Sequence, residues 1–178
     1  IAIDDAGDIL VTWSNETGAI LYATWQSTGA PPTMPTGCVP SIQQALGAPR
    51  LASGPDNRFA LVYADGAEGS GAVNLLGFSD NGWDNAPQSV GRGINPDVFV
   101  DADGQSHVAW CGSDGLVQYW GGENAEPVSD LLPCLNRPTL VEDSEGDIHI
   151  VWYADVVVNT FGRVSPGHFL YESILRPD

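Results

Sequence analysis

Apolar residues in this chain come in short runs, and polar turn-forming residues separate them. In the segment Pro96–Trp110, an apolar run at Asp97–Asp101 is followed by an acidic turn that ends at Gly104. A second apolar run follows at His107–Trp110. Runs of this length, bounded by aspartate and glycine, are typical of two strands joined by a tight turn, because glycine adopts the positive φ that such a turn needs. The segment therefore predicts a β-hairpin.

The same frame recurs along the chain. In each copy an aromatic residue lies six positions after the last turn residue. In three copies a proline lies eight positions before that turn residue, at Pro49, Pro96 and Pro138. The copies start 50, 47 and 42 residues apart, counted between turn residues. The four pairs of turn residue and aromatic are Gly7 with Trp13, Asn57 with Tyr63, Gly104 with Trp110, and Gly146 with Trp152. Such a period predicts one domain over residues 1–178, built from repeats at about 1–48, 49–95, 96–137 and 138–178.

Each repeat divides into the same predicted strands. The second strand of a repeat is apolar on both faces, which is typical of a strand buried between two layers. The last repeat ends before a fourth strand. In chain order, the expected strands are Ile1–Asp4, Ile9–Trp13 and Ile20–Trp25; Arg50–Ser53, Phe59–Tyr63, Val73–Phe78 and Gln88–Val90; Asp97–Asp101, His107–Trp110, Leu116–Trp120 and Pro127–Ser129; and Thr139–Glu142, Ile148–Trp152 and Phe169–Tyr171.

Four antiparallel strands per repeat predict an all-β fold, a β-propeller of four-stranded blades. A β-sandwich is the competing interpretation, but it does not predict the fixed order of proline, turn and aromatic. Four repeats either close a small ring or form an arc of a larger propeller. No proline precedes Ile1 and the last repeat is unfinished, so we expect an arc that is incomplete at one or both ends.

The net charge of the chain restricts the classes of molecule that it can bind. It has 23 acidic and six basic residues among 178, all six basic ones arginine, and a net charge of −17. This field repels phosphate backbones, which argues against nucleic acid as a partner. Only 16% of residues are charged, so the chain is not a disordered acidic tail, and no apolar run is long enough to span a membrane. An extracellular or cell-surface setting suits this composition.

The three cysteines are consistent with that setting. Cys111 follows the second strand of the third repeat, and Cys134 lies in the loop after the fourth strand. If the strands alternate in direction, both loops open on the same rim, so we expect a Cys111–Cys134 disulfide and an oxidising compartment. Cys38 occupies the matching late loop of the first repeat and is left over.

The acidic turns are candidate metal sites. Asp101 and Asp103 offer oxygen ligands of the kind that Ca²⁺ prefers. The favoured interpretation is turn chemistry, in which aspartate bonds its own backbone, so we expect no cofactor and keep Ca²⁺ as the alternative. His107 and His149 share a repeat position with Leu10 and Ala60, which indicates a packing role.

Three tryptophans fall outside the repeating aromatic position. Trp25, Trp83 and Trp120 lie at the ends of third strands or in loops. Exposed rings at such places stack on sugar faces, so these three are candidate ligand-binding residues. The alternative is that they bury the outer edges of the blades, as large aromatic side chains mostly do.

The repeat frame, best preserved in Pro96–Trp110 and Pro138–Trp152, resembles that of bacterial sialidase-like (BNR, Asp-box) propellers. Phe78–Trp83 is similar to an Asp-box with a shortened spacing. The resemblance implies a propeller and, in enzymes of the family, a tyrosine–glutamate pair, an aspartate acid and three arginines. Arg50 and Arg137 flank blade-opening prolines, but the adjacent Tyr171 and Glu172 point to opposite faces of a strand. We therefore assign no catalytic residue.

These observations favour a non-catalytic binding or scaffold module, outside the cell or on its surface, that serves as an accessory subunit of a larger assembly. Its partner would be a protein or a surface glycan. The unfinished last repeat would leave a strand edge through which chains assemble. The alternatives are a sialidase-like glycoside hydrolase and a carbohydrate-binding lectin propeller.

Overall fold

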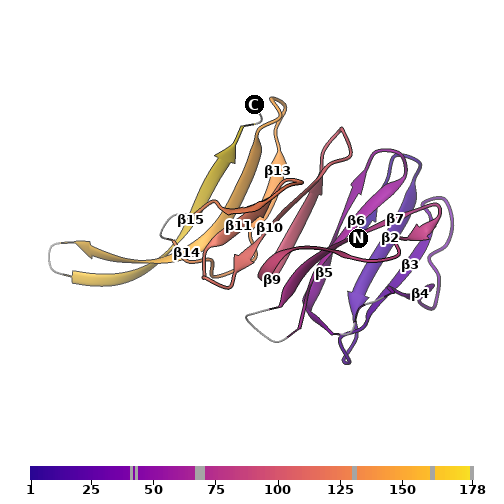
Figure 1. The fold of residues 1–178 in the computed structure, drawn as a ribbon, viewed down its shortest axis with the longest axis horizontal. Coiled ribbons are helices and arrows are strands. Elements are labelled where there is room, and N and C mark those ends of the chain that lie inside the picture. Colours follow the sequence, from indigo (N-terminus) through magenta and orange to yellow (C-terminus); the bar gives the residue numbers. More distant parts are fainter. Residues whose placement is uncertain (41, 43, 67–70, 130–131, 161–162, 177–178) are drawn as a thin grey trace.

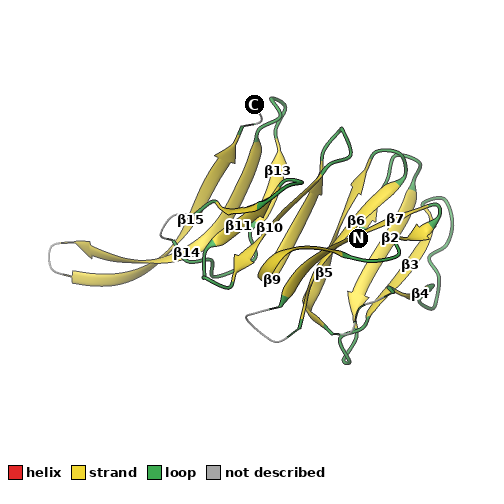
Figure 2. Cartoon of the chain, viewed as in Figure 1, coloured by secondary structure: helices red, strands yellow, loops and turns green. Residues whose placement is uncertain are grey.

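The computed structural model describes residues 1–40, 42, 44–66, 71–129, 132–160 and 163–176, and the side chains of these residues outside 155–168. The described chain consists of β-strands, turns and loops (Figure 2). No helix within these residues is long and apolar enough to cross a membrane. The prediction of an all-β fold is therefore confirmed.

The strands form three antiparallel sheets, and all strand pairs are antiparallel. The first sheet has the order β1 (Ala2–Ile3), β2 (Asp8–Ser14), β3 (Ile20–Gln26) and β4 (Gly37–Cys38). The second has the order β12 (Ala125–Pro127), β11 (Val117–Trp120), β10 (Ser106–Gly112), β9 (Gln88–Val100), β7 (Ala72–Ser79), β6 (Arg58–Asp65) and β5 (Ala45–Gly54), with β8 (Gly82–Trp83) paired to β7. The third has the order β13 (Thr139–Glu142), β14 (Ile148–Thr160) and β15 (Arg163–Leu175).

One long strand joins the second and third repeats. The predicted strand Gln88–Val90 and all but the last residue of the predicted strand Asp97–Asp101 belong to the single 13-residue strand β9. Its first part pairs with β7 and its second part with β10. Gly93 lies at the bend with a φ of 151°, and a Cβ there would come within 2.0 Å of the carbonyl oxygen of Cys111. Only glycine fits this close approach, so the strand turns from one repeat to the next without breaking.

Successive repeats pack face to face, with a separate core layer in each gap. Side chains that alternate along β6 supply two of the layers: Leu61 and Tyr63 face the first repeat, while Ala60 and Val62 face the third. All of Phe59–Ala64 is buried, which confirms a strand covered on both sides. The third layer lies between the third and fourth repeats around Trp152. Figure 1 shows the resulting row, which follows the sequence along the long axis of the molecule.

The two ends of the row differ from its middle. Tyr63, Trp110 and Trp152 are buried as predicted for the repeating aromatic, but Trp13 in the first repeat is only partly buried. In the fourth repeat Tyr153 is 51% exposed, because one face of β14 has no described layer against it. Within the expected strand Ile148–Trp152, the face of Ile148, Ile150 and Trp152 is buried, whereas the face of His149 and Val151 is only partly buried.

The described sheets form an open row and do not close into a barrel or ring, so a complete four-bladed propeller is not what the structure shows. The segment Asp155–Gly167, which lies between the expected strands Ile148–Trp152 and Phe169–Tyr171, continues the hairpin of β14 and β15. Its backbone pairing extends to Thr160 and Arg163, and its side chains lie outside the described residues. The strand alternation there is too weak in sequence to separate a long hairpin from a loop.

Candidate functional site

A buried histidine in the third repeat connects the acidic turn to the next two strands. Oδ1 of Asp101 accepts hydrogen bonds from the backbone N–H groups of Asp103 at 3.0 Å and Gln105 at 2.8 Å. Its Oδ2 lies 3.0 Å from Nε2 of His107, and Nδ1 of His107 lies 2.6 Å from the Tyr119 hydroxyl. His107 is 7% exposed and lies against the rings of Phe99 and Tyr119. This histidine is part of a polar core.

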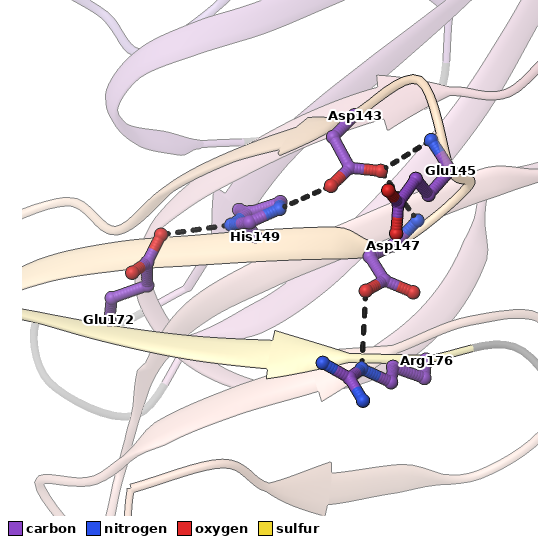
Figure 3. A network of polar contacts seen from close by, with 6 residues as sticks. All are labelled: Asp143, Glu145, Asp147, His149, Glu172 and Arg176. Atoms are coloured by element: carbon purple, nitrogen blue, oxygen red, sulfur yellow. Dashed lines mark hydrogen bonds and ion pairs between the residues drawn. The ribbon is translucent and has the colours of Figure 1, made fainter.

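The fourth repeat contains the same network on a more exposed face (Figure 3). Oδ1 of Asp143 accepts hydrogen bonds from the backbone N–H groups of Glu145 and Asp147, while Oδ2 lies 3.0 Å from Nε2 of His149. Nδ1 of His149 lies 2.9 Å from Oε1 of Glu172. Glu172 pairs across the strands as Tyr119 does in the third repeat, so it is the repeat equivalent of that tyrosine.

These contacts shift the titration of the groups involved. Hydrogen bonds from His149 and from the backbone N–H groups lower the pKa of Asp143. The carboxylates of Asp143 and Glu172 raise the pKa of His149. Burial, with smaller contributions from Glu126 and Asp101, raises the pKa of Tyr119 to about 12. A phenol with such a pKa stays protonated at neutral pH, so the Tyr119 hydroxyl can donate a hydrogen bond to His107.

The predicted metal ligands Asp101 and Asp103 take the roles of turn residues. The oxygens of Asp101 are engaged by two backbone N–H groups and an imidazole, and Asp103 contributes a backbone N–H to the turn. Among the described residues, no group of three or more histidine, cysteine, aspartate or glutamate side chains is arranged to hold a metal ion.

The network residues differ in the first two repeats. In the second repeat the three positions are occupied by Gly54, Ala60 and Leu75, so the aspartate, histidine and tyrosine are all absent. In the first repeat only the histidine is replaced, and the three residues are Asp4, Leu10 and Tyr22. Reading the histidines as packing residues missed this third-strand partner. The partner is identified only by the cross-strand register of the structure, which the sequence does not give.

A cleft opens beside these positions in each gap between repeats. The cleft between the first and second repeats has a volume of about 280 Å³ and is lined by Asp4 and Tyr22. Between the second and third, a cleft of about 420 Å³ is lined by Gly54, Ala60 and Leu75. Between the third and fourth, a cleft of about 580 Å³ is lined by the network of the third repeat. We name these the first, second and third clefts. The repeat sets their place, and the residues that vary between repeats set their chemistry.

The three candidate tryptophans lie in different environments. Trp120 is 6% exposed and packs in the core between the second and third repeats, with its indole N–H donating to the Glu123 carbonyl at 3.0 Å. It therefore presents no free ring face to a sugar. Trp83 is partly buried in an aromatic cluster, 4.8 Å from Phe78 between ring centroids. Trp25 is partly buried beside Trp13 and a proline-rich loop.

Arg50 on β5 and Arg137 just before β13 lie near the partly buried Asp97. Nε of Arg50 lies 3.7 Å from Oδ1 of Asp97. Arg137 donates to the carbonyl of Ala48 at 3.1 Å, and burial and the charge of Arg50 lower its pKa. Burial raises the pKa of Asp97, against the opposing effect of the two arginines. Tyr171 and Glu172 take other partners: Tyr171 stacks on Trp152 and Glu172 binds His149.

The predicted disulfide is present. Cys111 and Cys134 are bonded, with Cα atoms 5.4 Å apart, and Cys38 is free and exposed. The bond fixes the loop after β12 to the end of β10, on the rim where the two loops were expected to meet.

Comparison with known proteins assigns the chain to no family. No protein-family profile matches the chain, and no curated protein sequence matches it. Among solved structures, it is similar to a hypothetical protein from Leishmania major, with 14% sequence identity and a TM-score of 0.47. The match covers 99% of this chain and 67% of the other.

Proposed function

We propose that this protein is an extracellular or cell-surface binding module, built as an arc of propeller-like blades, that holds ligands in the clefts between its repeats. The observation that carries the proposal is the row of three clefts, whose linings differ although their positions repeat. The second cleft, of about 420 Å³, has the size of a small-molecule site and combines apolar walls with polar groups at its rim. The disulfide supports an oxidising compartment.

The second cleft is suited to a polar ligand such as part of a glycan or a peptide loop. Ala60, Leu75 and Val100 form an apolar floor, while Arg58 and Gln88 supply hydrogen-bonding groups. No Asp–His–Tyr network lines it, because the second repeat carries Gly54, Ala60 and Leu75 at those positions. A ligand can therefore use the floor for burial and the rim for orientation.

A ligand screen followed by NMR tests this proposal. A glycan array and a library of small polar compounds are applied to ¹⁵N-labelled protein, and shifted resonances are mapped to residues. Gln88→Trp places a large side chain at the second cleft, whereas Ser89→Trp changes the neighbouring exposed residue that does not line it. We expect ligands of this cleft to bind the Ser89 variant and not the Gln88 variant. Hits that map away from every cleft would contradict the proposal.

A glycoside hydrolase is the alternative that the two arginines near Asp97 favour. Arginine pairs bind carboxylates well, as a sialic acid substrate would require. If the protein hydrolyses a fluorogenic sialoside and Arg137→Ala abolishes this activity, the protein is a glycoside hydrolase and not a binding module.

A further inference from the structure

The carboxylate of Asp4 in the first repeat lacks a partner that its repeat equivalents have. Asp4 is 7% exposed, and its Oδ1 accepts the backbone N–H of Asp8 at 2.8 Å. Its Oδ2 is buried and has no hydrogen-bond partner among the described residues. In the third and fourth repeats the same oxygen contacts a histidine Nε2 at 3.0 Å, whereas the first repeat has Leu10 at the histidine position. A buried carboxylate oxygen is unfavourable unless a donor or a cation compensates it.

Asp4 lines the first cleft, whose other walls carry negative charge and aromatic rings. The carboxylates are those of Asp4, Asp8 and Asp80, and the rings are those of Tyr22, Phe59 and Phe78. The centroid of the Phe78 ring lies 5.9 Å from that of Tyr22 and 6.2 Å from that of Phe59. No lysine or arginine is among the described residues that line this cleft. Its charge is therefore uncompensated by the protein itself.

This lining suits an organic cation better than a metal ion. Calcium takes six to eight oxygen ligands, whereas Oδ1 of Asp4 is used by the turn and Asp8 is engaged by the side-chain amide of Gln26. An ammonium group attached to a short apolar chain places its charge at the carboxylate and its methylenes against the rings, and it gains from cation–π attraction. We infer that the first cleft binds an alkylammonium group, a ligand class for the binding function proposed above, on which this inference rests.

A titration with a minimal amine tests the inference. The probe is n-butylammonium chloride at low ionic strength, with n-butanol as a neutral probe of the same chain length, followed by ¹⁵N NMR on the whole protein. We expect saturable shifts around the first cleft with the amine and none with the alcohol. Asp4→Asn keeps the turn acceptor but removes the charge, and should weaken binding at least about tenfold, as for a lost charge-assisted bond. Asp5→Asn, an equal charge change at an exposed neighbour, should change it less than about twofold.

A second variant restores the missing side chain without removing a charge. In Leu10→His the imidazole is placed beside Asp4 and Tyr22, as His107 is beside Asp101 and Tyr119. We expect this variant to keep or raise its melting temperature and to lose butylammonium binding, because the histidine takes the free oxygen. Parallel titration with Nα-acetyl-lysine methylamide identifies the source: tighter binding than butylammonium assigns the site to a lysine side chain of a protein, and equal binding assigns it to a free amine.

The inference is overturned if butanol binds as well as butylammonium, if Asp4→Asn binds as tightly as the unchanged protein, or if Ca²⁺ competes with the amine for Asp4. Retention of amine binding in folded Leu10→His would also overturn it. Ligands that still occupy the second cleft, and are still excluded by Gln88→Trp, would show that the failure belongs to the first cleft alone and not to the binding module.

Discussion

Three residue positions decide the polar chemistry of each repeat. They are the first residue of the acidic turn, a residue of the second strand, and its neighbour on the third strand. In the third repeat these positions hold Asp101, His107 and Tyr119, which form a hydrogen-bonded network. In the second repeat they hold Gly54, Ala60 and Leu75, which form an apolar wall. The backbone frame is the same in both cases. Sequence change at these few positions therefore alters a cleft without altering the fold.

The exposed network of the fourth repeat makes stability depend on pH. Contacts with Asp143 and Glu172 raise the pKa of His149 above its usual 6.5. A raised histidine pKa stabilises the folded state fully below pH 6.5, and this contribution is lost as pH rises through the folded-state value. The lowered pKa of Asp143 affects stability at acidic pH. Its contribution to stability is lost as the pH falls from the usual aspartate pKa of 3.8 through the lower folded-state value. We therefore expect the urea concentration at the unfolding midpoint to decrease as the pH is raised from 6 to 9.

The variant His149→Gln separates this effect from other titrations. Its urea midpoint should change less between pH 6 and pH 9 than that of the unchanged protein, because the titrating imidazole is gone. Glu172→Gln should give an intermediate dependence, since Asp143 still contacts the histidine. Equal pH dependence in all three proteins would mean that the contacts in Figure 3 do not stabilise the folded state.

The sequence predicts where most strands lie, but it predicts less well the residues at which they begin and end. The expected strand Thr139–Glu142 coincides with β13, and Phe59–Tyr63 lies within β6, because alternating apolar residues and turn glycines are local signals. The continuity of β9 could not be read in this way. Gly91, Gly93 and Pro96 are typical of a loop, and only the close approach of Gly93 to Cys111 shows why glycine serves a strand there.

The environments of the three candidate tryptophans also depend on contacts that local sequence patterns do not reveal. Their place at strand ends left open whether the rings are exposed or cover the blade edges, because whether a ring is free depends on the neighbouring sheet. Trp120 packs against the second repeat and Trp83 against Tyr22 of the first, contacts that lie far apart in sequence. The clefts were missed for a similar reason, since they arise between repeats and not within one.

Replacing these tryptophans should separate core residues from surface ones. Trp120→Ala leaves a cavity between two sheets and should lower the free energy of unfolding by about 3–5 kcal/mol. Trp25→Ala, at a partly exposed position of the first sheet, should lower it by only about 1 kcal/mol. Equilibrium denaturation in guanidinium chloride measures both. A loss for Trp25→Ala as large as that for Trp120→Ala would contradict the different packing of the two rings.

The whole molecule is a stack of layers in which each repeat contacts mainly its neighbours in sequence. The three core layers join the first repeat to the second, the second to the third, and the third to the fourth. Such a stack has interior repeats covered on both faces and end repeats covered on one, which explains the exposure of Tyr153. Its stability is then approximately a sum of repeat and interface contributions. A covalent link within a repeat should add to the contribution of that repeat.

The Cys111–Cys134 disulfide is such a link, because it ties the end of β10 to the loop after β12 within the third repeat. It joins residues 23 positions apart, and closing a loop of this length stabilises the folded state by about 3 kcal/mol through the lost entropy of the unfolded chain. We expect Cys111→Ala combined with Cys134→Ala to lose about this much in equilibrium denaturation.

Reducing agent should lower the stability of the unchanged protein by a similar amount and leave the double variant unaffected. Cys38→Ser is the matched control, since that thiol is free and exposed, and it should behave as the unchanged protein does with and without reductant. If reductant leaves the unchanged protein as stable as before, the bond does not constrain the stack.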